Sequence, residues 1–286
     1  MSGPRQTTTQ TIAPADDAGP GGLDFARAAA VLTDAAAKAG AAIMAHFGDG
    51  SEVTLKDDNS PVTRADRDSE AIILAALARL APDIRVVSEE SCGTIGALPD
   101  RFFLVDPLDG TKEFIQKRGD FTVNVALIED GRPSFGLVYA PARALLAVTV
   151  AAGKAVSAEL PPSEPGADLG QLRQTTLRAR PPDKNGLTAL VSLSHLDPAT
   201  EAYLATLNIA ERSSVGSSVK FVALAKGDAD IYPRLGPTME WDTAAGQAVL
   251  EAAGGRVVTS GGEPLHYGKT EAGLRNPSFI AWGLRA

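Results

Sequence analysis

The sequence predicts a layered α/β protein, in which layers of helices and strands pack on one another. Two patterns lead to this prediction. In the second half of the chain, strand-like and helix-like segments alternate from residue 187 to residue 283. In the first half, short apolar runs that end in acidic residues are typical of buried strands. The composition, with 44% hydrophobic and 22% charged residues, is that of a folded globular protein.

Two helices are expected near the N-terminus. Residues 23–47 are rich in alanine, and Gly48 offers a place for this helix to end. A second helix follows in "PVTRADRDSEAIILAALARLAP", where Thr63 and Asp66 have the spacing of a capping box and Pro82 ends the segment. Between the two helices, "EVTLK" is expected to form a short strand and "DDNS" a polar loop.

Strands are expected next. "IRVVSEE" and "RFFLVD" have the pattern of short buried strands, each ending in acid. "FTVNVALIEDGRPSFGLVYAP" predicts a hairpin that turns at "EDGRP", and "ALLAVTVAAGKAV" predicts a second hairpin that turns near Gly153. In the second half, strands are expected in "LTALVSLS", "ADIYPRL", "GRVVTS" and "FIAWG", and helices in "DPATEAYLATL", "SSVKFVALAKG" and "WDTAAGQAVLEAAG".

These elements divide the chain into four regions. Residues 1–22 are polar and are expected to form a disordered tail. Residues 23–158 are expected to form an N-terminal α+β subdomain. Residues 159–186 begin with a stretch rich in proline, glycine and acid, and are expected to form a linker region. Residues 187–286 are expected to form a C-terminal α/β subdomain.

Charge and cysteine content limit the possible partners. The net charge is −8, from 27 basic and 35 acidic residues, which argues against binding of a nucleic-acid polymer. A small polyanion remains a suitable ligand if the acidic residues hold metal cations. The single cysteine, Cys92, excludes an intramolecular disulfide and is expected to be a loop or buried thiol. No run approaches about 18 consecutive apolar residues, so no membrane span is expected.

Acidic residues stand where predicted elements begin or end. Glu89 and Glu90 end one strand, Asp106 and Asp109 follow another, and Asp242 opens a helix. Side chains at such positions converge at one edge of a sheet in layered α/β proteins. Carboxylates and a backbone carbonyl, here that of Leu108 in the turn "DPLDG", are ligands that suit Mg²⁺ or Mn²⁺. The sequence therefore suggests a magnesium site.

Gly110 and Thr111 open a short predicted helix directly after this turn. The first N–H groups of a helix can hold a phosphate, and a phosphate beside magnesium suits phosphate-ester hydrolysis. A purely structural interpretation stays open from the residues alone. In that interpretation Asp109 is a helix N-cap, Asp106 a turn residue, and Asp66 the acid of the capping box. Asp242 would then be an acid of a first helical turn.

The motifs "VSEES", "DPLDGTKEF" and "WDTAAG", in this order, resemble the Mg²⁺-dependent, lithium-sensitive phosphatase superfamily. This superfamily includes inositol monophosphatases, fructose-1,6-bisphosphatases and 3′(2′),5′-bisphosphate nucleotidases. "DNSPVTRAD", "DGTKEF", "GSSVKF" and "YPRLGPT" look like the bacterial CysQ-type nucleotidases within it. Inositol monophosphatases usually have threonine and asparagine where this chain has Lys112 and Glu113. The resemblance covers residues 23–286 and implies a five-layered αβαβα sugar-phosphatase fold.

The resemblance also implies roles for particular residues. It implies a cluster of about two to three Mg²⁺ ions, or Mn²⁺ in their place. The ligands would be Glu89, Asp106, the Leu108 carbonyl, Asp109 and Asp242. Asp66 and Thr111, together with Glu89, match positions that activate the attacking water. Gly110 and Thr111 would hold the phosphate, and the remaining nucleotide contacts would be His195, Ser217, Lys220 and Arg234.

The expected activity is hydrolysis of the 3′-phosphate of adenosine 3′,5′-bisphosphate, or of its sulfated relative, in sulfur metabolism and nucleotide recycling. The alternatives are an inositol or sugar monophosphatase and a metal- or nucleotide-binding module without catalysis. Each of three proposed nucleotide contacts also has a purely structural alternative. Lys220 could be a solvated helix charge, Arg234 part of a structural ion pair, and His195 a surface residue. The protein is expected to be a monomer or homodimer in the cytoplasm. Peripheral association with the inner membrane is compatible with this location.

Overall fold

The computed structural model describes residues 22–47, 53–55, 61–93, 95–163, 165–192 and 197–284. Four expectations fall outside these ranges. They are the disordered tail up to residue 21, the helix stop at Gly48, the polar loop "DDNS" at residues 57–60, and the role of His195.

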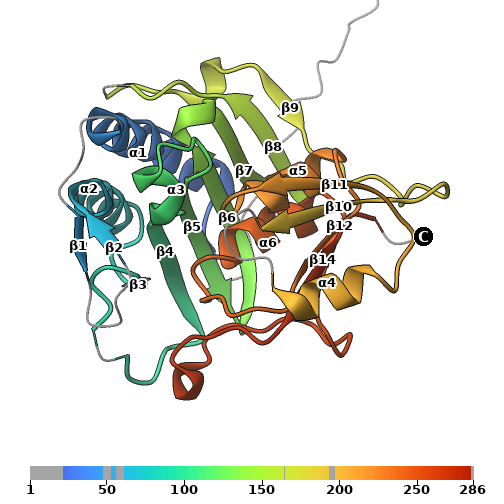
Figure 1. The fold of residues 1–286 in the computed structure, drawn as a ribbon. Coiled ribbons are helices and arrows are strands. Elements are labelled where there is room, and N and C mark those ends of the chain that lie inside the picture. Colours follow the sequence, from blue (N-terminus) through green and yellow to red (C-terminus); the bar gives the residue numbers. More distant parts are fainter. Residues whose placement is uncertain are drawn as a thin grey trace, which may run out of the picture.

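Most of the strands belong to two large sheets (Figure 1). In the seven-stranded sheet the order is β3-β4-β5-β6-β7-β8-β9, in which only the β3–β4 pair is parallel. Its strands are β3 (Arg85–Ser88), β4 (Arg101–Asp109), β5 (Thr122–Glu129), β6 (Arg132–Ala140), β7 (Leu145–Ala151), β8 (Lys154–Glu159) and β9 (Gln174–Thr176). Both predicted hairpins, β5–β6 and β7–β8, are confirmed and lie side by side in this sheet.

The second large sheet has five strands in the order β11-β10-β12-β14-β13. These strands are β11 (Ile209–Val215), β10 (Leu187–Ser192), β12 (Ile231–Arg234), β14 (Phe279–Trp282) and β13 (Arg256–Thr259). A separate pair is formed by β1 (Val53–Leu55) and β2 (Pro61–Thr63).

Helices fill the spaces beside and between the sheets (Figure 1). The helices α1 (Phe25–His46) and α2 (Arg64–Leu80) cover one face of the seven-stranded sheet. The helices α5 (Val219–Lys226) and α6 (Ala244–Ala252) lie between the two large sheets, and α4 (Pro198–Leu204) contacts the five-stranded sheet. The short α3 (Thr111–Ile115) follows β4.

Three hydrophobic cores show that this arrangement has five layers. One core joins the outer helices to the large sheet, and includes Leu32 and Leu137. A second joins the other face of that sheet to α5, α6 and the smaller sheet, through residues such as Phe221. The third lies between the smaller sheet and α4, around Leu204 and Val191. This αβαβα order confirms the layered fold class.

The two N-terminal helices form where the sequence predicts them. The α2 helix begins after Thr63, and the capping box between Thr63 and Asp66 is present. The α1 helix is long and apolar enough to cross a membrane by length and composition alone. However, 56% of the apolar window is buried inside the structure, against the large sheet, as expected for a core helix.

Three strands were not expected from the sequence. β2 forms in "PVT", which was expected to open the second helix. β11 runs parallel to β10 at the edge of the smaller sheet, and most of its side chains are exposed. An edge strand with exposed faces has little hydrophobic alternation, so its polar sequence "IAERSSV" carried no strand signal. β9 forms within the segment expected as a linker, and pairs with β8.

The segment "DPLDG" differs from the expected turn. β4 continues through it to Asp109, with a shift in its pairing to β5 between Asp106 and Asp109. Pro107 has no N–H to donate to a strand ladder, and such an irregularity is where a strand tolerates proline. A β-bulge re-aims side chains, which brings both aspartates to the same region of the molecule.

Gly136 in β6 shows how closely the central helices approach the large sheet. A Cβ atom at Gly136 would lie 2.3 Å from the carbonyl oxygen of Ala245 and 2.8 Å from the Cβ of Ala248. Both neighbours belong to α6, so α6 can lie this close to β6 only because Gly136 has no side chain.

We expect Gly136→Ala to lower the free energy of unfolding by at least about 2 kcal/mol, because helix and sheet must separate to admit the methyl group. Urea denaturation followed by circular dichroism measures this. Gly96→Ala is the matched control, since a Cβ there meets nothing within 4 Å, and we expect a change within about 0.5 kcal/mol. Equal stability of the two variants would contradict the close approach of α6.

Candidate functional site

Three acidic side chains from two separate segments meet at one point. Asp106 and Asp109 come from the end of β4, and Asp242 precedes the Thr243 N-cap of α6. Each offers one carboxylate oxygen, and these oxygens all lie within 4.8 Å of one another. The helix α6 begins two residues later than the sequence suggested, so Asp242 lies just before the helix rather than in its first turn.

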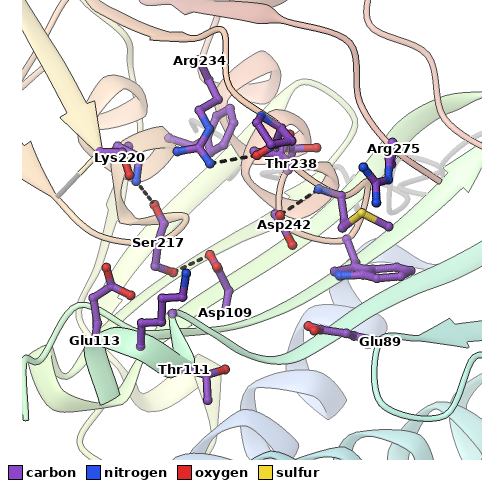
Figure 2. A pocket seen from close by; sticks show the side chains of 18 of the residues that line it. Glu89, Asp109, Thr111, Glu113, Ser217, Lys220, Arg234, Thr238, Asp242 and Arg275 are labelled. Carbon is purple, nitrogen blue, oxygen red and sulfur yellow. Dashed lines mark hydrogen bonds between the residues drawn. The ribbon is translucent and has the colours of Figure 1, made fainter. Parts of the chain in front are cut away.

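The fourth predicted acid, Glu89, follows β3 and lines the same cavity as Asp109 and Asp242 (Figure 2). Its charge contributes to the raised pKa values of both Asp106 and Asp242. The parallel pairing of β3 with β4 explains this, because the carboxyl ends of parallel strands lie at the same edge.

The bulge in β4 is held by hydrogen bonds from its own residues and from α2. The backbone N–H of Leu108 donates to Oδ1 of Asp106 at 3.0 Å. The hydroxyl of Ser69, a buried residue of α2, donates to the carbonyl oxygen of Pro107 at 2.7 Å. One carboxylate oxygen of Asp106 is thus used in the bulge.

Burial and mutual repulsion make ionisation of this cluster costly. Burial raises the pKa of Asp106 well above its ordinary value, and the charges of Glu89, Asp109 and Asp242 raise it further. Burial likewise raises the pKa of Asp242, and Asp109 and Glu89 add to this, whereas the Met239 N–H and Arg234 act in the opposite direction. A multivalent cation between the carboxylates would relieve both effects.

Two serines at the start of α5 connect the aspartates. The Ser217 hydroxyl and the Ser218 N–H donate to the same oxygen of Asp109, Oδ2, at 2.6 and 2.9 Å. The Ser218 hydroxyl donates to the backbone carbonyl of Asp242 at 2.7 Å. Met239 N–H donates to Oδ2 of Asp242 at 2.9 Å. The start of α5 therefore links Asp109, at the end of β4, to the loop that carries Asp242.

Asp66 makes both the helix-capping contacts and the contact with Thr111, the two alternatives that the sequence left open. Its Oδ2 accepts from the N–H and the hydroxyl of Thr63 at 2.7 and 2.6 Å, which completes the capping box. Its Oδ1 accepts from the Thr111 hydroxyl at 3.3 Å. Thr111 also lies 3.2 Å from the carbonyl oxygen of Leu108. One carboxylate oxygen therefore serves the helix, and the other faces the site.

A cavity of about 600 Å³ opens beside the acidic cluster (Figure 2). This volume is in the range of small-molecule sites. Acidic and basic groups share its walls, so one ligand can meet both. Among the described residues its lining includes Glu89, Cys92, Asp109, Gly110, Thr111, Lys112, Glu113, Ser192, Ser217, Lys220, Tyr232, Arg234, Trp241, Asp242 and Arg275.

Lys220 and Arg234 both line this cavity although both side chains are buried, at 3% and 7% exposed. Burial lowers the pKa of Lys220 to about 8, although Asp109 acts in the opposite direction. Arg234 donates from Nη2 to the Pro237 carbonyl at 2.9 Å. Burial excludes the solvated-charge interpretation of Lys220.

The structure thus brings together every predicted site residue that it describes. His195 lies outside the described residues. Sequence reasoning missed Ser218, which adjoins Ser217 in the quoted motif "GSSVKF", and Asn124, whose amide donates to the Ser218 hydroxyl at 3.1 Å. It also missed Ser69. No local pattern marks these three, because their partners lie far away in the chain. Cys92 is half-buried at the cavity, with Sγ 3.5 Å from the Glu89 carbonyl.

The raised pKa values predict how stability depends on pH when no cation is present. A carboxyl whose folded-state pKa is raised binds more protons folded than unfolded, so its ionisation lowers the free energy of unfolding as pH rises. We expect Asp242→Asn, measured in EDTA by urea denaturation, to be more stable than wild type at pH 8 by on the order of 1 kcal/mol. The difference should shrink towards pH 5. A constant difference across this range would show that Asp242 ionisation has no effect on stability.

Comparison with known proteins places these features in context. Residues 24–283 match the model of the inositol monophosphatase family. The 3′(2′),5′-bisphosphate nucleotidase CysQ of Escherichia coli is 44% identical over 250 residues, which cover 85% of this chain and 95% of that protein. The corresponding CysQ of Buchnera aphidicola is 37% identical over 235 residues, covering 81% and 84% of the two chains.

Solved structures agree with this result. The crystal structure of CysQ from Bacteroides thetaiotaomicron, described as a bacterial member of the inositol monophosphatase family, superposes with a TM-score of 0.76 at 38% identity. It covers 92% of this chain and 100% of that chain. An inositol monophosphatase from Anabaena has a TM-score of 0.64 at 24% identity, covering 89% of each chain, which shows similarity of fold alone.

Proposed function

The chain belongs to the inositol monophosphatase family, and from that premise we propose that it hydrolyses the 3′-phosphate of adenosine 3′,5′-bisphosphate to give AMP and phosphate. The sulfated relative of this nucleotide is the proposed second substrate, and sulfur metabolism and nucleotide recycling the proposed setting. One observation carries the proposal: a single cavity combines the acidic cluster with Lys220 and Arg234. A bisphosphate needs a cation site for the phosphate that leaves and positive side chains for the phosphate that stays.

The acidic cluster fits magnesium. Its donors are hard oxygens, three carboxylates converge within 4.8 Å, and the pKa values of Asp106 and Asp242 are raised by burial and repulsion. We propose that about two to three Mg²⁺ ions, or Mn²⁺, bind here. When bound, Mg²⁺ would polarise the phosphoryl oxygens and acidify water. The proposed ligands are Glu89, Asp106, the Leu108 carbonyl, Asp109 and Asp242.

Asp66 and Thr111 supply the proposed base. The Thr111 hydroxyl donates to Asp66, so its oxygen can accept a hydrogen bond from the attacking water. The water would then present a lone pair to phosphorus, while Glu89 helps to orient it. The N–H groups of Gly110 and Thr111 are proposed to hold the phosphate, since Gly110 precedes α3 in a left-handed conformation with φ 94°. Attack in line would need no covalent enzyme intermediate.

The opposite wall is proposed to bind the rest of the nucleotide. Ser217 and Arg234 would contact the ribose and the phosphate that is not cleaved. The ammonium of Lys220 already donates to two backbone carbonyls. Its proposed contribution to nucleotide binding is therefore mainly its positive charge. His195, outside the described residues, is proposed to lie near the base. A monomer or homodimer and a cytoplasmic location remain predictions of this proposal.

We expect adenosine 3′,5′-bisphosphate to be hydrolysed with Mg²⁺ at a kcat/KM at least about tenfold above that for inositol monophosphate, a difference of about 1.4 kcal/mol in transition-state binding. The preference for the bisphosphate would come from Lys220 and Arg234, whose positive charges attract the second phosphate. Phosphate release from both substrates measures it, and EDTA should abolish both reactions. Hydrolysis of inositol phosphate alone would replace the nucleotidase proposal with a monophosphatase.

Asp66→Asn should reduce turnover by at least about a hundredfold, because an amide cannot take the proton that a general base accepts. Binding of Mn²⁺, measured by electron paramagnetic resonance, should stay within about twofold of wild type. Asp68→Asn is the matched control, since Asp68 lies on the same helix and pairs with His46. Turnover of Asp66→Asn equal to that of the control would remove Asp66 from the mechanism and favour a role in capping α2 alone.

A further inference from the structure

The loop that precedes α5 has a backbone conformation that needs support. Ser217 has φ 54°, in the left-handed region that non-glycine residues seldom adopt. Such a conformation is unfavourable for a residue with a side chain and persists only where the surroundings enforce it. It places the Ser217 hydroxyl and the Ser218 N–H on the same oxygen of Asp109. The orientation of Asp109 therefore depends on the conformation of this loop.

One side of the loop is packed against the chain after α3. The Gly216 N–H donates to Oδ2 of Asp120 at 3.0 Å, and Asp120 forms an ion pair with Arg143. A Cβ at Gly216 would lie 2.6 Å from the Cβ of Asp120. Contacts on this side leave no space for a side chain at Gly216.

Lys220 supports the same loop from the other side (Figure 2). Its Nζ donates to the carbonyl of Val215 at 3.1 Å and to the carbonyl of Ser217 at 2.7 Å. The same Nζ lies 5.0 Å from the centre of the Tyr232 ring, within the range of a cation–π contact. Two of the three N–H groups of the ammonium are thus used by the carbonyls on either side of Gly216.

We propose that Lys220 is a positioning residue for the cation site: it holds Ser217 in its left-handed conformation and thereby fixes Asp109. This inference rests on the proposed cation site at Asp109. An ammonium suits the task, because one group must donate to two carbonyls at different angles, which no apolar side chain can do. The positive charge also offsets the negative charge of Asp109, which counteracts part of the lowering of the Lys220 pKa by burial.

Three variants test this role through binding of Mn²⁺ without substrate, measured by electron paramagnetic resonance. Lys220→Met keeps the length of the side chain but removes its donors, and we expect about a tenfold weaker affinity. Ser217→Ala removes the hydroxyl on Asp109, with a similar loss expected. Because both act on Asp109, the double variant should lose less than the product of the single losses. Lys226→Met is the control on the same helix, with an exposed side chain, and should bind as wild type.

The outcomes separate the possible roles. Wild-type Mn²⁺ affinity in Lys220→Met, with a raised KM for the bisphosphate, would overturn the proposal and make Lys220 a substrate contact. Losses that multiply fully would overturn the connection through Ser217. If wild type itself binds no Mn²⁺, the cation site of the proposed function fails and this inference with it. Circular dichroism checks folding, and Lys220→Gln, which keeps two donors, should bind Mn²⁺ more tightly than Lys220→Met.

Discussion

The structure depends on one electrostatic constraint, the meeting of three aspartate carboxylates where β4 ends and α6 begins, with Glu89 in the same cavity. Burial and repulsion together raise the pKa values of Asp106 and Asp242. Such a cluster persists only if the surrounding chain holds each group in place, because the carboxylates would otherwise separate into water. Much of the local structure serves this purpose. The β-bulge, the serines before α5 and the loop before α6 each donate hydrogen bonds to one of these aspartates.

In several of the acidic residues, one carboxylate oxygen accepts hydrogen bonds that hold the local structure. Asp106 uses one oxygen in its bulge, and Asp109 uses Oδ2 for two donors from the start of α5. Asp66 uses one oxygen to cap α2 and the other to accept from Thr111. In all three residues the protein fixes the side chain through one oxygen. Helix capping and the proposed catalytic role therefore do not exclude one another at Asp66, since each would use a different oxygen.

Much of the fold followed from local patterns. The capping box at Thr63, the hairpin turn at Gly131 and the run of apolar residues in β4 predicted their elements because each signal acts within a few residues. The predicted family was confirmed for the same reason, since its motifs are short and contiguous. The sequence did not predict β11, because an exposed edge strand forms through pairing with its neighbour, here β10. It did not predict the bulge in β4 either, because a proline between two aspartates is equally typical of a turn.

The sequence by itself determined the kinds of groups in the site: oxygen ligands at the ends of elements, a threonine after a glycine, and two cations in the second half. Only the tertiary structure decided that these groups share one cavity, and that Lys220 is buried against the carbonyls of its own loop. The physical reason is distance along the chain. Asp109 and Ser217 are separated by 108 residues, and only packing of α5 between the two sheets brings them into contact.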